Sequence, residues 1–222
     1  MTKRVKVFLT VVCCLVLVVA SIMGTLAYMT NRDEVVNTFT VGKVQITVNE
    51  TNVDVYGEKV DDTRVKENDY KLIPGKTYIK DPTMTVEKGS EPAYVRMLLT
   101  LNKKTQLDEV FAPGIELTEI FKGYDPTVWV FEKESSDSAK NTVTYEFRYK
   151  EAVDARDAQN DVKLEALFNS FTLPGSVSSA DLELLKDFQI TVVGHAIQTA
   201  ELGTADEAWA AFDEQYPDVV AP

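Results

Sequence analysis

Hydrophobic and polar residues alternate along much of the chain after residue 40, and this period of two is typical of β-strands. The clearest case is residues 142–150, TVTYEFRYK, which predicts an antiparallel strand buried on one face only. Residues 94–101, YVRMLLTL, predict a second strand. Residues 188–198, FQITVVGHAIQ, carry hydrophobic side chains on both faces and predict a central strand covered on both sides. Shorter strands are expected near Met84 and Trp129, and in 167–173.

Helical signals are few and short. Ser178 with Asp181, and Thr204 with Glu207, have the spacing of a capping box, so a helix is expected to begin at each pair. A third short helix is expected near 105–111, TQLDEVF.

The connecting segments are polar. Residues 51–75 predict a long charged loop that ends in a turn at Pro74-Gly75, and 132–141 predict an exposed hairpin loop. With no repeat and no low-complexity linker after the leader, the expected fold is all-β. We expect a single antiparallel β-sandwich over 28–222 with a few short helices on its loops.

The first 27 residues have a different composition. A basic start at Lys3, Arg4 and Lys6 precedes an apolar stretch, and no charged residue occurs from Val7 through Asn31. Thr25 and Ala27 are the small residues that a signal peptidase requires, so 1–27 is interpreted as a helical signal peptide that is removed before Tyr28. A retained membrane anchor is the competing interpretation, because about 20 apolar residues suffice to span a bilayer.

Net charge and cysteine content then reduce the number of function classes that fit the chain. Removing the leader takes the formal charge from −12 to −15, which argues against binding to nucleic acid or to anionic lipid. Cys13 and Cys14 lie within the leader behind Val12, which does not fit a lipidation site, so we interpret them as apolar filler. The mature chain then has no cysteine for a disulfide, a thiolate zinc site or a nucleophile.

The sequence contains one histidine, His195, within the predicted strand 188–198. It is interpreted either as an ordinary strand residue or as a metal ligand or general base. A helical zinc-peptidase site needs two histidines one turn apart, and no G-x-S-x-G or phosphate-binding loop occurs. The absence of a mechanistic motif favours a structural or adhesive protein over an enzyme.

Two acidic clusters in the polar loop, Asp61-Asp62 and Glu67-Asn68-Asp69, are weak candidates for calcium binding. They lack the spacing of an EF-hand, and a solvated loop is the competing interpretation. No other cofactor is expected.

One stretch of the sequence gives a more specific indication of the protein family. The leader ends in GTLAY and is followed by TNRDEVVNTFTVGKVQITV, which contains Asn37, Phe39, Thr40 and Gly42. Together with residues 72–97, with ITVVGHAIQT and with EAWAAF, this stretch resembles exported bacterial proteins of the TasA/camelysin family, which a SipW-type signal peptidase processes. The resemblance is strongest over 20–100 and 185–212.

The resemblance implies a jelly-roll β-sandwich, secreted to the cell surface or extracellular matrix, whose subunits form a biofilm-matrix fibre. It also implies that an N-terminal arm, here 28–41, adds as a strand to another copy or to a related matrix subunit. The residues assigned to this donor strand are Tyr28, Val35, Val36 and Phe39. The camelysin branch carries a metallopeptidase label, so a secreted metallopeptidase is an alternative, and a monomeric spore or cell-surface accessory protein is another.

The parity of the apolar positions changes within this stretch. Phe39 and Val41 are odd-numbered, whereas Val44, Ile46 and Val48 are even-numbered. Gly42 lies at the change, where a β-bulge would shift the register by one residue. The sequence thus predicts an arm before Gly42 that is free to pair elsewhere and a strand after it that belongs to its own sandwich.

Overall fold

Three antiparallel sheets make up the computed structural model, which describes residues 43–111, 120–200 and 202–217. The described residues belong to one compact unit, Gly42–Pro222. The leader 1–27, its cleavage residues Thr25, Ala27 and Tyr28, the arm 28–41 and Gly42 lie outside the described residues.

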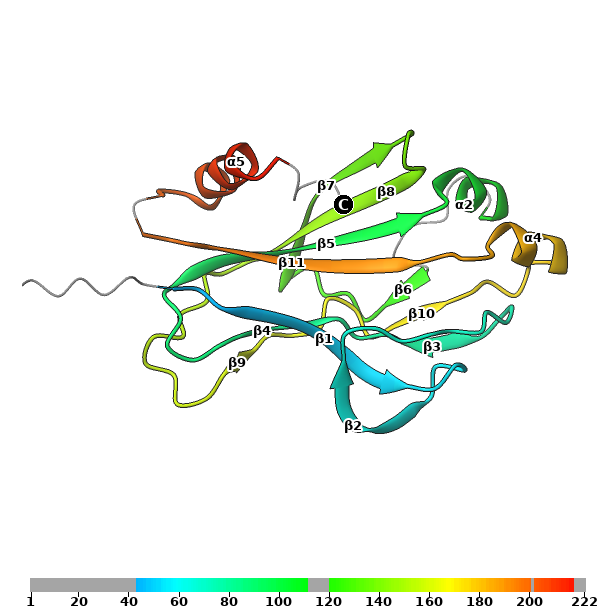
Figure 1. Ribbon diagram of the computed structural model, residues 1–222, viewed down its shortest axis with the longest axis horizontal. Helices are drawn as coiled ribbons and strands as arrows, with labels where there is room; N and C mark the ends of the chain where they lie inside the picture. The colour runs from blue at the N-terminus through cyan, green and yellow to red at the C-terminus, as the bar shows by residue number, and fades with distance from the viewer. Residues whose placement is uncertain (1–42, 112–119, 201, 218–222) are drawn as a thin grey trace, which may run out of the picture. The chain divides into compact units, whose positions relative to one another are not determined.

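The longest sheet has the strand order β11 (Ile190–Gln198), β5 (Ala93–Asn102), β8 (Thr142–Tyr149) and β7 (Trp129–Asp137). It forms the upper layer of the unit in Figure 1. The strands 142–150, 94–101 and 188–198 were therefore predicted correctly as strands. Residues 188–198 do not form a central strand, because β11 pairs with β5 alone among the described strands.

Two smaller sheets form the lower layer (Figure 1). One has the order β2 (Lys59–Val65), β1 (Ile46–Val53), β4 (Thr83–Val86) and β9 (Val162–Lys163). The other has the order β3 (Thr77–Ile79), β10 (Ser170–Thr172) and β6 (Phe121–Lys122).

The core lies between the layers because alternate residues of each strand point inward. On β5 these are Val95, Met97, Leu99 and Leu101, all buried in one cluster with residues of β4, β6 and β10. Trp129 at the start of β7 is fully buried, and its indole Nε1 donates a hydrogen bond of 3.1 Å to the Glu165 carbonyl. The fold is therefore all-β, as predicted.

Three short helices complete the described part. They are α2 (Lys104–Val110), α4 (Ser179–Leu184) and α5 (Ala205–Gln215). Ser178 and Asp181 form the capping box of α4, and Thr204 and Glu207 form that of α5, as the spacing predicted. None of the helices in this part of the chain is long and apolar enough to cross a membrane.

Some predictions about exposed segments were wrong. The polar segment 51–75 contains strand β2, which pairs with β1 despite its charges. β7 continues to Asp137, so the hairpin turn between β7 and β8 is shorter than predicted. On β8 the face expected to be solvated includes Glu146, which is 1% exposed, because neighbouring side chains cover it.

The turn after β1 is held by a close backbone contact. Gly57 has φ of 74°, and a Cβ there would lie 2.8 Å from the Tyr78 Cα. Gly89 has a similar φ of 78°, but a Cβ there would meet nothing within 4 Å. A comparison of alanine substitutions at the two glycines therefore distinguishes the cost of backbone strain from the cost of a steric clash.

We predict that Gly57→Ala lowers the free energy of unfolding by about 3 kcal/mol, because strain and overpacking add. Gly89→Ala should cost about 1 kcal/mol, because it introduces strain alone. Urea unfolding followed by tryptophan fluorescence measures both. Equal losses in the two variants would contradict the contact between Gly57 and Tyr78.

Candidate assembly site

β11 is a long strand with one open edge. All nine of its residues pair with β5, from Ile190 opposite Leu101 to Gln198 opposite Ala93. Within the described ranges no strand pairs with its other edge. Alternate backbone N–H and C=O groups along that edge therefore have no strand partner among the described residues.

The opposite edge of the same sheet is built differently. β7 has the sequence WVFEKESSD and carries Glu132, Lys133 and Glu134, and its register shifts between Phe131 and Lys133. Charged residues and bulges are devices that keep an edge strand from pairing with other chains. β11, with the sequence ITVVGHAIQ, contains no Asp, Glu, Lys or Arg. The β11 edge thus lacks the protection that the β7 edge has.

β1 and β11 belong to different sheets but lie side by side (Figure 1). Gly194 permits this approach, because a Cβ at that position would lie 2.5 Å from Val48 Cγ2 and 2.6 Å from Met84 Cε. β1 pairs with β4 through Ile46–Asn49 and with β2 only from Glu50 onward. The first half of β1 thus has a second open edge among the described residues.

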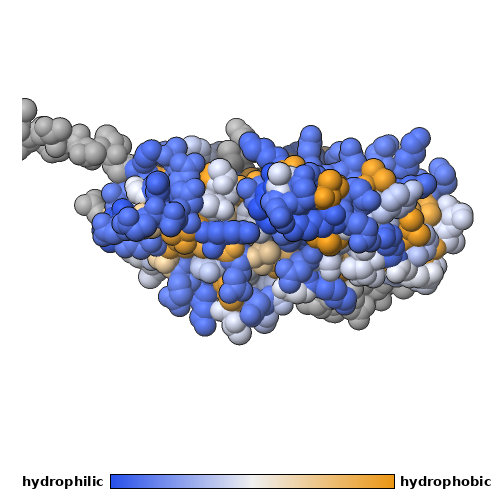
Figure 2. All heavy atoms as spheres, turned by 90° about the horizontal axis from the view of Figure 1, so that it is seen from below, coloured by the Kyte–Doolittle hydropathy of each residue, from blue (hydrophilic) through white to orange (hydrophobic). Residues whose placement is uncertain are grey.

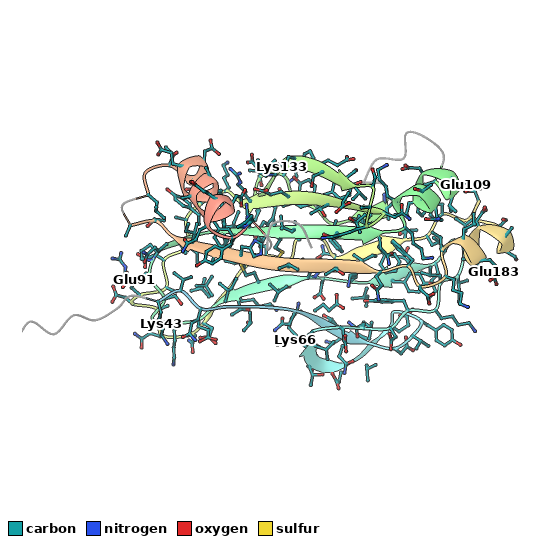
Figure 3. All side chains as sticks on the ribbon, turned by 45° about the horizontal axis from the view of Figure 1, so that its top comes forward. Lys43, Lys66, Glu91, Glu109, Lys133 and Glu183 are labelled. Atoms are coloured by element: carbon teal, nitrogen blue, oxygen red, sulfur yellow. The ribbon has the colours of Figure 1, made fainter. Side chains whose placement is uncertain are left out.

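A groove of about 900 Å³ lies between the two strands toward the start of β11. Its walls come from the middle of β1, the segment after β2 and the end of α4, including Lys66 and Glu183, which Figure 3 labels. Val48, Leu185 and Val192 supply apolar surface, and Glu50 and Lys80 lie among its lining residues. The groove thus borders the first three residues of β11, Ile190–Val192, and contains polar side chains.

The lower face of the unit is mostly hydrophilic, with small separate hydrophobic patches (Figure 2). Large apolar side chains that remain exposed include Val55, Tyr56, Val60 and Ile73, all in or near the hairpin of β1 and β2. Scattered apolar residues of this kind are normal on a protein surface. They do not form a second candidate site.

A buried charged cluster fixes α5 to the outer face of the long sheet. Arg96 on β5 is fully buried, and its Nη2 lies 2.6 Å from Asp213 Oδ1 on α5. Its guanidinium stacks 4.3 Å from the ring centre of Trp209 and 5.0 Å from that of Phe212. The sequence reasoning missed Arg96, although an arginine within the apolar run YVRMLLTL was a signal of a buried ion pair.

Glu146 and Arg148 on β8 extend this cluster. Arg148 Nε donates a hydrogen bond of 2.8 Å to Glu146 Oε1, and Arg148 Nη1 lies 2.6 Å from Asp206 on α5. Lys133 on β7, labelled in Figure 3, lies 3.3 Å from Glu146 Oε2. The cluster therefore links three strands to α5 and has the character of a structural ion-pair network.

His195 belongs to this cluster. Arg96 Nε donates a hydrogen bond of 3.2 Å to His195 Nδ1, and the imidazole stacks on Phe212 at 5.0 Å. Because Nδ1 accepts, Nε2 carries the proton, and it has no hydrogen-bond partner among the described residues. Burial and, to a smaller extent, the Arg96 charge lower the pKa of His195 to about 4, although Asp213 and Glu146 oppose the shift. A neutral histidine packed under α5 fits the interpretation as an ordinary strand residue.

The acidic clusters considered for calcium are bound to their neighbours. Asp61 accepts hydrogen bonds from the Thr63 backbone and side chain, which lower the pKa of Asp61, and Asp62 pairs with Lys59. The Asn68 side chain donates a hydrogen bond to Glu50 on β1, which lies outside the acidic cluster Glu67-Asn68-Asp69. Across the described ranges, no three His, Cys, Asp or Glu side chains are grouped so as to hold a metal ion.

No protein-family model, no curated protein and no solved structure gives a significant match to this chain.

We predict that the stability of the protein falls by about 2 kcal/mol as the pH drops from about 6.5 to 4. The unfolded chain takes up a proton on His195 within this range, whereas the folded chain, in which the pKa is about 4, does not. His195→Asn keeps an acceptor for Arg96 but does not titrate, so it should reduce this pH dependence. Urea unfolding of both proteins at several pH values tests the difference, and parallel curves would contradict the buried neutral imidazole.

Proposed function

We propose that this chain is an exported cell-surface or extracellular-matrix protein with a jelly-roll-like β-sandwich that assembles into fibres. In this proposal a SipW-type signal peptidase cuts after Ala27, and the freed arm 28–41 of one copy adds as a strand to the next copy. The resemblance of residues 20–100 and 185–212 to the TasA/camelysin family supports both the cleavage of the leader and the assembly by strand addition.

The open, uncharged edge of β11 is the observation that carries this proposal. An extended segment from another copy can satisfy the backbone groups of that edge, which is the recognition mode of β-strand addition. Tyr28, Val35, Val36 and Phe39 would provide apolar side chains for the groove beside it. Because the arm and the groove are different surfaces, each added copy exposes a new groove, and the assembly grows as a filament rather than closing.

Processing of the leader can be tested directly. We expect the protein recovered from culture medium to begin at Tyr28, because Thr25 and Ala27 provide the small residues at the cleavage site. Ala27→Lys should block cleavage and leave the longer chain with the cells. Recovery of the wild-type protein with an intact leader would contradict this part of the proposal.

The arm itself is tested by comparing purified 28–222 with a chain that begins at Val41. The longer protein should form filaments in electron micrographs and sediment as a polymer, and the shorter one should remain monomeric. Equal polymerisation of the two would show that the arm is not the donor strand. A monomeric 28–222 would instead favour the accessory-protein alternative.

The acceptor edge is tested by a charge placed on it. Thr191 on β11 and Ser135 on β7 are both exposed, on opposite edges of the same sheet. We expect Thr191→Lys to reduce filament formation at least tenfold, because a charge on an edge strand opposes strand addition. Ser135→Lys should leave it unchanged, and both variants should unfold at the wild-type urea concentration. The same loss in the two variants would contradict a role specific to β11.

A further inference from the structure

Three side chains from separate segments meet at the groove. Lys80, just after β3, places its Nζ 2.6 Å from Glu50 Oε2 on β1. Glu50 Oε1 accepts a hydrogen bond of 2.9 Å from the side-chain Nδ2 of Asn68, which follows β2. One carboxylate therefore binds an amine through one oxygen and a carboxamide through the other.

The carboxamide of Asn68 is fixed by the backbone of β1. The register of β1 shifts between Thr51 and Val53, which leaves backbone groups there without partners on β2. The Val53 N–H donates a hydrogen bond of 3.0 Å to Asn68 Oδ1, and Asn68 Nδ2 donates one of 2.9 Å to the Thr51 carbonyl. These contacts orient the amide, and the Val53 N–H is placed to stabilise negative charge on Oδ1.

The amine lies in a largely apolar environment. Lys80 is 7% exposed and Glu50 is 5% exposed, and the Lys80 Nζ lies 5.7 Å from the centre of the Tyr70 ring. Tyr70 in turn packs edge-on against Tyr78 and Phe171. Glu50 Oε2, 2.6 Å from the Lys80 Nζ, is within hydrogen-bond distance to accept a proton from it. The product of that transfer is a neutral amine, the nucleophilic form of lysine.

We propose that Lys80 and Asn68 form an intramolecular isopeptide bond, with Glu50 acting as the general base and then as the general acid. This assignment needs no cofactor and no oxidant, because every group in the reaction belongs to the cluster.

The reaction balances in its atoms and charges. Glu50 takes a proton from the Lys80 ammonium, and the free Nζ attacks Asn68 Cγ, so that a C–N bond forms and negative charge moves to Oδ1 beside the Val53 N–H. Glu50 moves a proton from Nζ to Nδ2, which lies 2.9 Å from its Oε1. The bond between Cγ and Nδ2 then breaks, and ammonia leaves with the proton as ammonium through the groove. The product is an amide between Lys80 and Asn68, and Glu50 is a carboxylate again.

Mass spectrometry of the purified wild-type protein tests the proposal. We expect a mass lower by one ammonia than that calculated from the observed N-terminus. A tryptic digest should contain the peptide Glu67–Lys71 attached to the peptide Thr77–Lys88, because trypsin does not cut after a linked Lys80. A wild-type protein of the calculated mass, with these two peptides separate, would overturn the proposal.

Asn68 precedes Asp69, so cyclisation of Asn68 onto its own backbone would also release ammonia. Lys80→Arg distinguishes the two reactions, because arginine keeps the charge next to Glu50 but is not a nucleophile. The proposal expects this variant to have the full calculated mass, and loss of ammonia from it would overturn the proposal. If the variant does not fold, the linked or separate peptides of the wild-type protein still decide the question.

Glu50→Gln tests the assigned base, since glutamine is similar in shape but does not accept the proton. We expect the linked fraction to fall at least tenfold in this variant. Full linkage in Glu50→Gln would overturn the role of Glu50. These measurements do not depend on filament formation, so their outcome is separate from that of the assembly experiments.

Discussion

The strand β5 is the constraint on which the rest of the fold depends. It pairs along most of its length with two others, β8 on one side and β11 on the other, and both of its faces are buried. Its inward residues form the centre of the core. On the outward face Arg96 is fully buried, and this requires the carboxylates and aromatic rings of α5 above it. Arg96 thus contributes strongly to the position of α5, together with Arg148 and His195.

The two edges of this sheet differ in how well they are protected against pairing with another strand. β7 ends the sheet with charged residues and a bulge, which are features that prevent further pairing. β11 ends it with an uncharged strand beside a groove. An edge of this kind that remains without a partner strand is a site at which chains can aggregate.

Much of this fold could be predicted from local patterns. Period-two alternation identified β5, β8 and β11, and the capping boxes at Ser178 and Thr204 identified the start of two helices. These features depend on residues close in sequence. The position of β11 at an edge could not be predicted, because its apolar residues on both faces are typical of a central strand. β2 was missed because its charges resemble those of a loop.

The groove and the cluster of Lys80, Glu50 and Asn68 could not be predicted from the sequence for a similar reason. The three residues come from three segments and meet through strand pairing and the bulge in β1, and neither is visible in a local pattern. Asn68 did attract attention in the sequence, but as part of a possible calcium site. The structure places its amide against Glu50, which changes its chemical environment from a solvated acidic loop to a buried amine and carboxylate.

The position of β1 has a mechanical consequence. The described unit begins just before β1, so in a fibre joined through the preceding arm, tension enters the subunit along the axis of this strand. The four residue pairs that join β1 to β4 then bear the load together in shear, rather than breaking one after another as in a zipper. Rupture of a subunit in such a fibre would require the whole ladder to slip at once, and the strand that would receive the load lies next to the groove that we propose as the site for the following copy.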